Sequence, residues 1–167
     1  DQEKEYANGT ERCAAAITDS NFIKYIGHYD NIINVQGDMP DVDVAMIQQV
    51  QWHLQHYSVT TAFTKMPKEK QDDPNSVKMV RAGDSALWFG RGMTGYGDWH
   101  LGIYGYRRNA LEMYRQLEVP QEEYIEQLEQ LRWLKNAWQI GCLSVQYNGV
   151  EINAPEDVDL WHKINSQ

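Results

Sequence analysis

Helical and extended patterns alternate along this chain, and the alternation limits the folds that are open to it. Residues 30–35 (DNIINV) are typical of a buried strand, and residues 43–57 show the apolar spacing of a helix. Further elements are expected as a helix at 10–26, strands at 59–63, 76–80, 86–89, 100–106 and 139–145, and helices at 108–117, at 121–137 and from 155. The pattern predicts an α/β fold, a three-layer α/β/α sandwich with a mostly parallel sheet.

A single domain spanning residues 1–167 is the organisation that the length favours. The chain has 167 residues, 42% of them apolar, which is enough for one hydrophobic core. No repeat or linker divides it, and the polar stretch at 65–75 (KMPKEKQDDPN) is expected to be a surface loop. Because the chain opens with a polar stretch and a helix, we expect the sheet to lack its first βα unit or units.

The charge balance argues against nucleic acid as a partner. There are 15 Lys and Arg against 24 Asp and Glu, and the resulting net charge of -9 repels polyanions. Small anionic ligands remain possible, since a few placed arginines and backbone amides can bind phosphate or carboxylate. There is no long apolar run that would suggest a membrane partner, and Cys13 and Cys142 match no metal-ligand spacing, so we expect a reduced, cytoplasmic setting.

A polar turn, Gln36-Gly37-Asp38, follows the predicted strand at 30–35 directly. Ligands of α/β sheets bind at the carboxyl ends of the strands, so this turn is expected at a ligand-binding edge. The carboxylate of Asp38 is a hard oxygen ligand of the kind that Mg²⁺ prefers. For an isolated Gly-Asp pair, simple capping of the turn is the other interpretation.

Several segments, taken in order, resemble one enzyme family. They are 8–12 (NGTER), 34–40 (NVQGDMP), 73–78 (DPNSVK), 86–91 (ALWFGR), 100–107 (HLGIYGYR), 128–132 (LEQLR) and 154–157 (APED). Together they resemble the CMP-KDO synthetases, the cytidylyltransferases that join CMP from CTP to 3-deoxy-manno-octulosonate (KDO) for lipopolysaccharide biosynthesis. Each segment alone is a weak signal, but their shared order across nearly the whole chain is specific. The resemblance implies a nucleotide-diphospho-sugar transferase-like fold.

The resemblance also implies the reaction and its substrates. A sugar hydroxyl attacks the α-phosphate of CTP and expels pyrophosphate, so CTP and KDO or a related sugar acid are the expected partners. The nucleotide contacts that it implies are Gly9, Thr10, Glu11, Arg12 and Gln36.

The cofactor implied by the resemblance is Mg²⁺, with Asp38 as one ligand. The family has a second aspartate ligand just before the segment that matches 154–157, where this chain has the neutral Asn153. Because Mg²⁺ relies on few anionic ligands, we expect the ion to be weakly bound or absent.

For the sugar acid, the resemblance implies contacts from Arg91, His100, Tyr104, Glu129 and Gln130. A guanidinium suits a bidentate pair with a carboxylate, and the other four side chains offer donors and acceptors to hydroxyls. Judged singly, His100 and Tyr104 are ordinary strand residues, and Glu129 and Gln130 belong on a solvated helix face.

A homodimer is also implied by the resemblance. Trp88 and Trp99 lie in the central segments, where they are either interface anchors or core residues.

Departures from the family leave other functions open. The family's basic N-terminal loop, which holds the triphosphate, is not in this sequence, and Met39 and Trp99 replace an acidic and a basic residue. We therefore expect this chain alone to be inactive in CMP-KDO synthesis. The alternatives are an acylneuraminate-type CMP-sugar synthetase, or a degenerate non-catalytic module for sugar binding or dimerisation.

Overall fold

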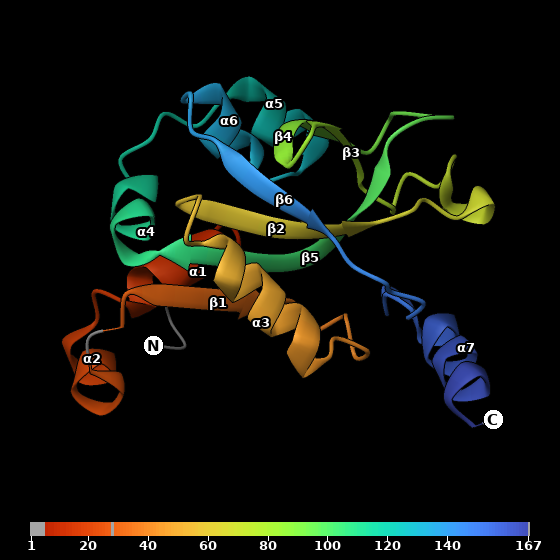
Figure 1. Ribbon diagram of the computed structural model, residues 1–167, viewed down its shortest axis with the longest axis horizontal. Helices are drawn as coiled ribbons and strands as arrows, with labels where there is room; N and C mark the ends of the chain where they lie inside the picture. Colours follow the sequence, from red (N-terminus) through yellow and green to blue (C-terminus); the bar gives the residue numbers. More distant parts are fainter. Residues whose placement is uncertain (1–5, 28, 167) are drawn as a thin grey trace.

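The computed structural model describes residues 6–27 and 29–166, whose strands form a six-stranded sheet (Figure 1). The strands lie side by side in the order β1-β5-β2-β6-β4-β3. Their bounds are β1 Asn31–Val35, β2 Val59–Thr64, β3 Lys78–Ala82, β4 Ser85–Gly90, β5 Asp98–Arg107 and β6 Ile140–Ser144. The strands predicted from the sequence are therefore all present, and the turn at Gly83, whose φ of 61° suits glycine, joins β3 and β4 as a hairpin.

Strand β5 organises the sheet because it pairs with three other strands. It runs antiparallel to β1, to β2 and to the start of β3. Among the strands of the described residues, parallel pairing joins β2 and β6, while the other neighbours are antiparallel. The α/β class is confirmed, whereas the expected predominance of parallel pairs is corrected. The reason is that β5 lies between β1 and β2 and keeps these two like-directed strands from pairing with each other.

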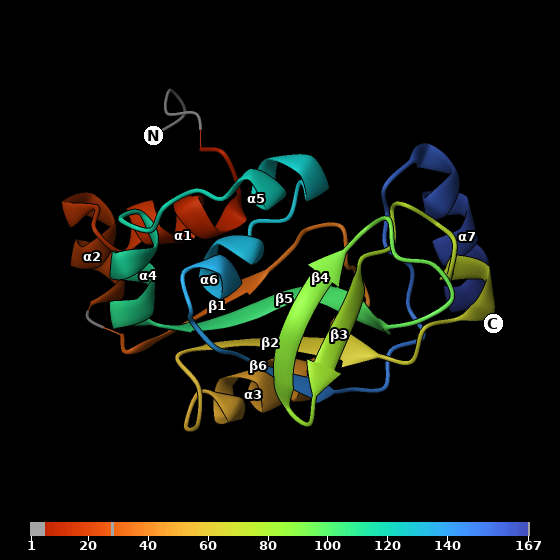
Figure 2. The same cartoon turned by 90° about the horizontal axis from the view of Figure 1, so that it is seen from above.

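Helices cover both faces of the sheet, which confirms the three layers. Their bounds are α1 Gly9–Ala16, α2 Ser20–Ile26, α3 Val44–His53, η1 Lys68–Lys70, α4 Arg108–Tyr114, α5 Gln121–Glu126, α6 Leu131–Lys135 and α7 Pro155–Asn165. Figure 2 shows α3 below the sheet and α1, α4, α5 and α6 above it. No helix within residues 6–27 and 29–166 has the length and apolar character needed to cross a bilayer.

Two of the predicted helices are each divided into two shorter helices. The expected helix at 10–26 is α1 and α2, because the Asp19 side chain caps a new helix by accepting from the amide of Asn21. Asn8, rather than Thr10, caps α1 through the amide of Glu11. The expected helix at 121–137 is α5 and α6, since Gln127 takes a left-handed conformation with φ of 55° and ends α5.

The hydrophobic core has two clusters, one on each side of the sheet. Tyr106, Tyr114 and Trp133 belong to the cluster beneath α1, α4 and α6, and Trp99 belongs to the cluster beneath α3. Trp99 is 2% exposed and is therefore a core residue. Trp88 is partly buried and packs against the first cluster, so neither tryptophan stands out as an interface anchor.

Candidate functional site

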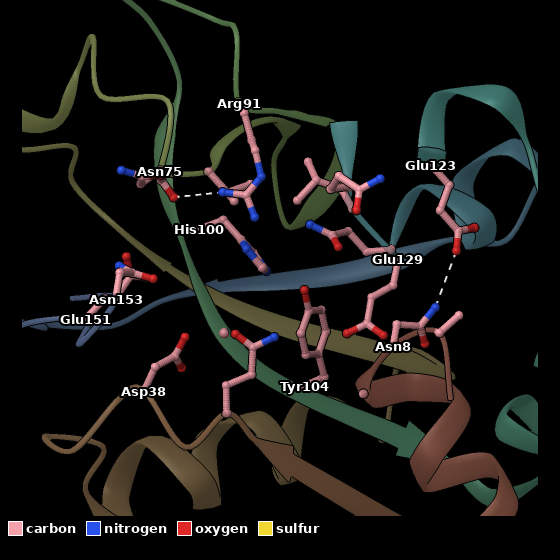
Figure 3. A pocket seen from close by; sticks show the side chains of 18 of the residues that line it. Asn8, Asp38, Asn75, Arg91, His100, Tyr104, Glu123, Glu129, Glu151 and Asn153 are labelled. Atoms are coloured by element: carbon pink, nitrogen blue, oxygen red, sulfur yellow. Dashed lines mark hydrogen bonds between the residues drawn. The ribbon is translucent and has the colours of Figure 1, made fainter. Parts of the chain in front are cut away.

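A pocket of about 440 Å³ opens above the middle of β5, between the end of β1 and the segment that links α5 to α6 (Figure 3). The lining residues predicted from the sequence are Gly9, Gln36, Asp38, Arg91, His100, Tyr104, Glu129, Gln130 and Asn153. These residues come from six separate segments of the chain and meet in one cavity. The structure brings together the predicted sugar contacts, the predicted metal position and two of the predicted nucleotide contacts.

Gln36 reaches the pocket from the end of β1 by packing against a glycine. Its backbone amide donates to the carbonyl of Gly102 at 3.1 Å. Its side chain occupies the space that a side chain at Gly102 would need. The register of β2 on β5 shifts here, with Thr61 opposite Tyr104 and Ala62 opposite Leu101. The bulge and the glycine therefore fix where the side-chain amide of Gln36 lies.

His100 and Tyr104 project from β5 on the side of Gly102, because residues two apart on a strand share a face. The Thr61 hydroxyl donates to the carbonyl of Ile103 at 2.8 Å, so at 2.9 Å it accepts from the Nε2–H of His100. His100 Nδ1 is then the acceptor of a neutral ring. Burial, and after it the charge of Arg91, lower the pKa of His100 to about 3, which keeps the ring neutral at physiological pH.

Arg91 lies at the end of β4 and is held on both its backbone and its side chain. Its amide donates to a carboxylate oxygen of Glu126 at 2.8 Å, and its Nη1 donates to the carbonyl of Asn75 at 2.9 Å. The buried ammonium of Lys78 donates to the carbonyl of Arg91 at 3.0 Å. These bonds orient the guanidinium before any ligand arrives.

Glu129 and Gln130 lie in the turn between α5 and α6, not on a solvated helix face. The amide of Thr10 donates to Glu129 Oε2 at 2.7 Å, and burial raises the pKa of the Glu129 carboxyl above its usual value. Gln130 is 2% exposed, and its Nε2 has no hydrogen-bond partner among the described residues. A buried amide nitrogen without a partner is costly, so this group is set to bind something in the pocket.

The structure does not bring Thr10, Glu11 and Arg12 into the pocket. The Thr10 hydroxyl bonds with the hydroxyl of Tyr106 at 2.8 Å, and Glu11 pairs with Arg132 at 3.0 Å. The side chain of Arg12 is exposed. Thr10 and Glu11 thus support the wall of the pocket. The nucleotide contacts of all three residues stay predictions.

Ten further residues line the pocket that the sequence reasoning missed. Six of them have polar side chains: Asn8, Asn75, Glu123, Tyr124, Gln127 and Glu151. Asn8 and Asn75 fall inside matched segments, so those segments were the available signal. Glu151 lies two residues before Asn153, and burial raises its pKa to about 7, with the charge of Asp38 adding to the effect and Lys70 opposing it.

The chemistry of the donors fits a divalent cation only in part. No cluster of three or more His, Cys, Asp or Glu side chains is found within the described part of the chain. Asp38 nevertheless has a buried Oδ1 atom without a hydrogen-bond partner among those residues, and Glu151 lines the same pocket. Because Mg²⁺ needs only one or two carboxylates when substrate oxygens and waters complete its shell, the residues present are compatible with it.

Proteins of known family are similar to this chain in sequence. A 3-deoxy-manno-octulosonate cytidylyltransferase of a Nitratiruptor species is 33% identical, covering 98% of this chain and 71% of that protein. An 8-amino-3,8-dideoxy-manno-octulosonate cytidylyltransferase of Shewanella halifaxensis is 33% identical, covering 91% of this chain and 66% of that protein. A 3-deoxy-manno-octulosonate cytidylyltransferase of Rickettsia prowazekii is 36% identical, covering 78% of this chain and 55% of that protein. The chain thus spans between about half and about 70% of these relatives.

Solved structures agree with the sequence relatives. A CMP:2-keto-3-deoxy-manno-octonic acid synthetase complexed with CTP superposes with a TM-score of 0.83 at 25% identity, covering 99% of this chain and 70% of that one. The sequence profile of the cytidylyltransferase family matches residues 2–140. This chain therefore belongs to the cytidylyltransferase family, together with the 3-deoxy-manno-octulosonate cytidylyltransferases that match it along most of its length.

Proposed function

We propose that the protein acts as a cytidylyltransferase on a 3-deoxy-octulosonate sugar acid. One observation carries the proposal: the pocket gathers Arg91, His100, Tyr104, Glu129 and Gln130, which the resemblance assigned to the sugar, from three distant parts of the chain. In this reaction the sugar hydroxyl oxygen bonds to the α-phosphorus of CTP. The bond from that phosphorus to the bridging oxygen breaks, pyrophosphate leaves, and the hydroxyl proton passes to solvent or a base.

The chain's own residues would bind and orient the sugar acid. The guanidinium of Arg91, which donates to the backbone carbonyls of Glu126 and Asn75, is suited to the sugar carboxylate. The neutral ring of His100 and the Nε2 of Gln130, which has no partner within the described part of the chain, are suited to hydroxyls, as is the Glu129 carboxyl. Such fixed partners lower the entropy cost of reaching the reactive geometry.

Calorimetric titration of KDO into the chain tests the assignment. We expect wild type and Arg115→Gln to bind alike, because Arg115 is exposed and lies outside the pocket. Arg91→Gln should weaken binding about tenfold or more, since it removes a charge-assisted hydrogen bond. No binding of KDO by the wild type, or equal binding by Arg91→Gln, contradicts the proposal. N-Acetylneuraminate serves as the competing ligand, and tighter binding of it would favour an acylneuraminate-type activity.

An 8-amino sugar acid is a second candidate substrate. The Shewanella relatives are named for it, and the pocket has an acidic lining, with Asp38, Glu123, Glu129 and Glu151. A carboxylate facing the terminal carbon of the sugar would favour an ammonium over a hydroxyl. The same titration with the 8-amino analogue decides between the two sugars.

For the cofactor we propose Mg²⁺, held through Asp38. The ion would neutralise charge that develops on the phosphates. Affinity through Asp38 and Asn153 alone is expected to be weak, because the amide carries no charge.

We also propose that the chain forms a homodimer, as the family resemblance implies. Leu160 and Ile164, four residues apart on one face of α7, are 47% and 48% exposed and offer apolar surface to a second copy. Light scattering across a concentration series measures the mass. A monomer at every concentration contradicts this proposal.

A further inference from the structure

We propose that Glu151 supplies the second carboxylate of a divalent-cation site centred on Asp38, in place of the neutral Asn153. The inference rests on the proposed function, because it concerns the cation that the transfer would use. It assigns to this chain a ligand that the family resemblance does not provide.

A backbone hydrogen bond brings the two carboxylates to the same wall of the pocket. The amide of Ile152 donates to the carbonyl of Asp38 at 2.8 Å, so the residues on either side of Ile152 flank Asp38. Glu151 and Asn153 both line the pocket, and Figure 3 shows them beside Asp38. Glu151 is the more enclosed of the two, being half-buried where Asn153 is exposed.

The other carboxylates near this wall are already engaged in the fold. Asp157 accepts from the amides of Asn153 and Ala154 at 2.9 and 2.8 Å and so caps α7. Asp41 accepts from the indole nitrogen of Trp161 at 2.8 Å. Neither can turn to a cation without losing these bonds, which leaves Asp38 and Glu151.

Two unpaired groups show that the pocket is built for a ligand. Asp38 Oδ1 is buried without a partner among the described residues, and such an oxygen requires a donor or a cation. Gln130, in the turn between α5 and α6 that lines the same pocket, leaves its buried Nε2 equally unpaired among those residues. A divalent cation would satisfy the orphaned oxygen, while Gln130 would bind an oxygen of the sugar acid or nucleotide.

Calorimetric titration of Mg²⁺ alone, without sugar or nucleotide, tests the assignment. Free Mn²⁺ measured by electron paramagnetic resonance gives a second readout that is sensitive to weak sites. We expect Glu151→Gln and Asp38→Asn each to weaken cation binding about tenfold or more, since each removes one of few anionic ligands. Glu156→Gln is the matched control, because Glu156 is an exposed acid of the same segment outside the pocket. It should bind as the wild type does.

The rescue variant separates a ligand from a general charge effect. Glu151→Gln combined with Asn153→Asp should recover most of the lost affinity, because a carboxylate returns at a neighbouring position of the same wall. Circular dichroism establishes that every variant is folded. The proposal is overturned if the wild type binds neither ion, or if Glu151→Gln binds as tightly as Glu156→Gln.

The two proposals fail in different ways. Cation binding is measured here without substrate, whereas the sugar-acid titration described above needs no cation. If the wild type binds KDO but no cation, Glu151 is removed as a ligand and the proposed function stands.

Discussion

The two ends of the pocket are built in different ways. At the sugar end, Arg91, His100 and Glu129 are each fixed by hydrogen bonds to the surrounding fold. At the cation end, Asp38 and Glu151 come from loops joined by the bond from the Ile152 amide to the Asp38 carbonyl, and a carboxylate oxygen of Asp38 is left unpaired among the described residues. Packing thus fixes the residues of the proposed sugar end before binding, whereas the proposed cation end would be completed by its ligand. Substitutions should therefore cost stability mainly at the sugar end.

The largest expected effect is on the buried ion pair behind the sugar end. Arg132 donates to both oxygens of Glu123, at 2.6 and 2.8 Å, and Glu123 lines the pocket. Arg132→Met should lower the free energy of unfolding by about 3–5 kcal/mol, because it leaves a buried carboxylate unpaired. Urea denaturation of the wild type and the variant measures this difference in the free energy of unfolding. Lys135→Met is the control: Lys135 lies in α6 as Arg132 does, its exposed pair with Glu122 of α5 is broken, and the effect should be much smaller. Equal losses in the two variants would contradict the distinction.

The next effect is a dependence of stability on pH through His100. Its folded-state pKa of about 3 lies below the ordinary 6.5, so between these values the unfolded chain binds a proton that the folded chain does not. Stability should therefore fall as pH falls through this window, by about 1.4 kcal/mol for each pH unit from this residue. His100→Gln lacks the titrating ring, and the difference between its stability and that of the wild type isolates the contribution. Parallel pH profiles for the two proteins would show that His100 is not buried in neutral form.

A smaller effect, and one of opposite sign, is expected at Gln130. Replacing the unpaired amide with a side chain of similar shape, in Gln130→Met, should raise the free energy of unfolding by about 1 kcal/mol while weakening KDO binding. Gln116→Met, at an exposed position outside the pocket, is the control for both measurements. A destabilised Gln130→Met variant would mean that the amide has a structural partner.

The smallest effect is expected at the cation end. In the absence of divalent ions, Asn153→Asp should change the free energy of unfolding by less than about 0.5 kcal/mol, and Glu151→Gln should not lower it, because burial already raises the pKa of the carboxyl that this change removes. Neither side chain is needed for the hydrogen bond between Ile152 and Asp38, which joins backbone groups. Thermal unfolding in the presence of a chelator measures the change. A loss as large as that of Arg132→Met would show that both ends belong to one rigid frame.

The helix breaks show what periodicity alone could not give. Apolar spacing across 121–137 is continuous, yet α5 stops at Glu126 and the left-handed Gln127 turns the chain. That turn carries Glu129 and Gln130 into the pocket, where Glu129 accepts from the amide of Thr10. The bond joins residues far apart in the sequence, so no local pattern predicts it. The segment 128–132 lies within the residues that the family profile matches, but no local pattern predicts its burial.

The sequence by itself determined the alternation of helices and strands, the polar turn at 36–38 after β1, and the ordered segments that identify the family. These features are local, because the faces that an element buries are written in its own residues. Only the tertiary structure decided that β5 lies between β1 and β2, that Trp99 belongs to the core, and that the backbone of Ile152 bonds with that of Asp38. Each of these depends on contacts between distant segments, whose choice of partner is settled by packing of the whole sheet and not by any local pattern.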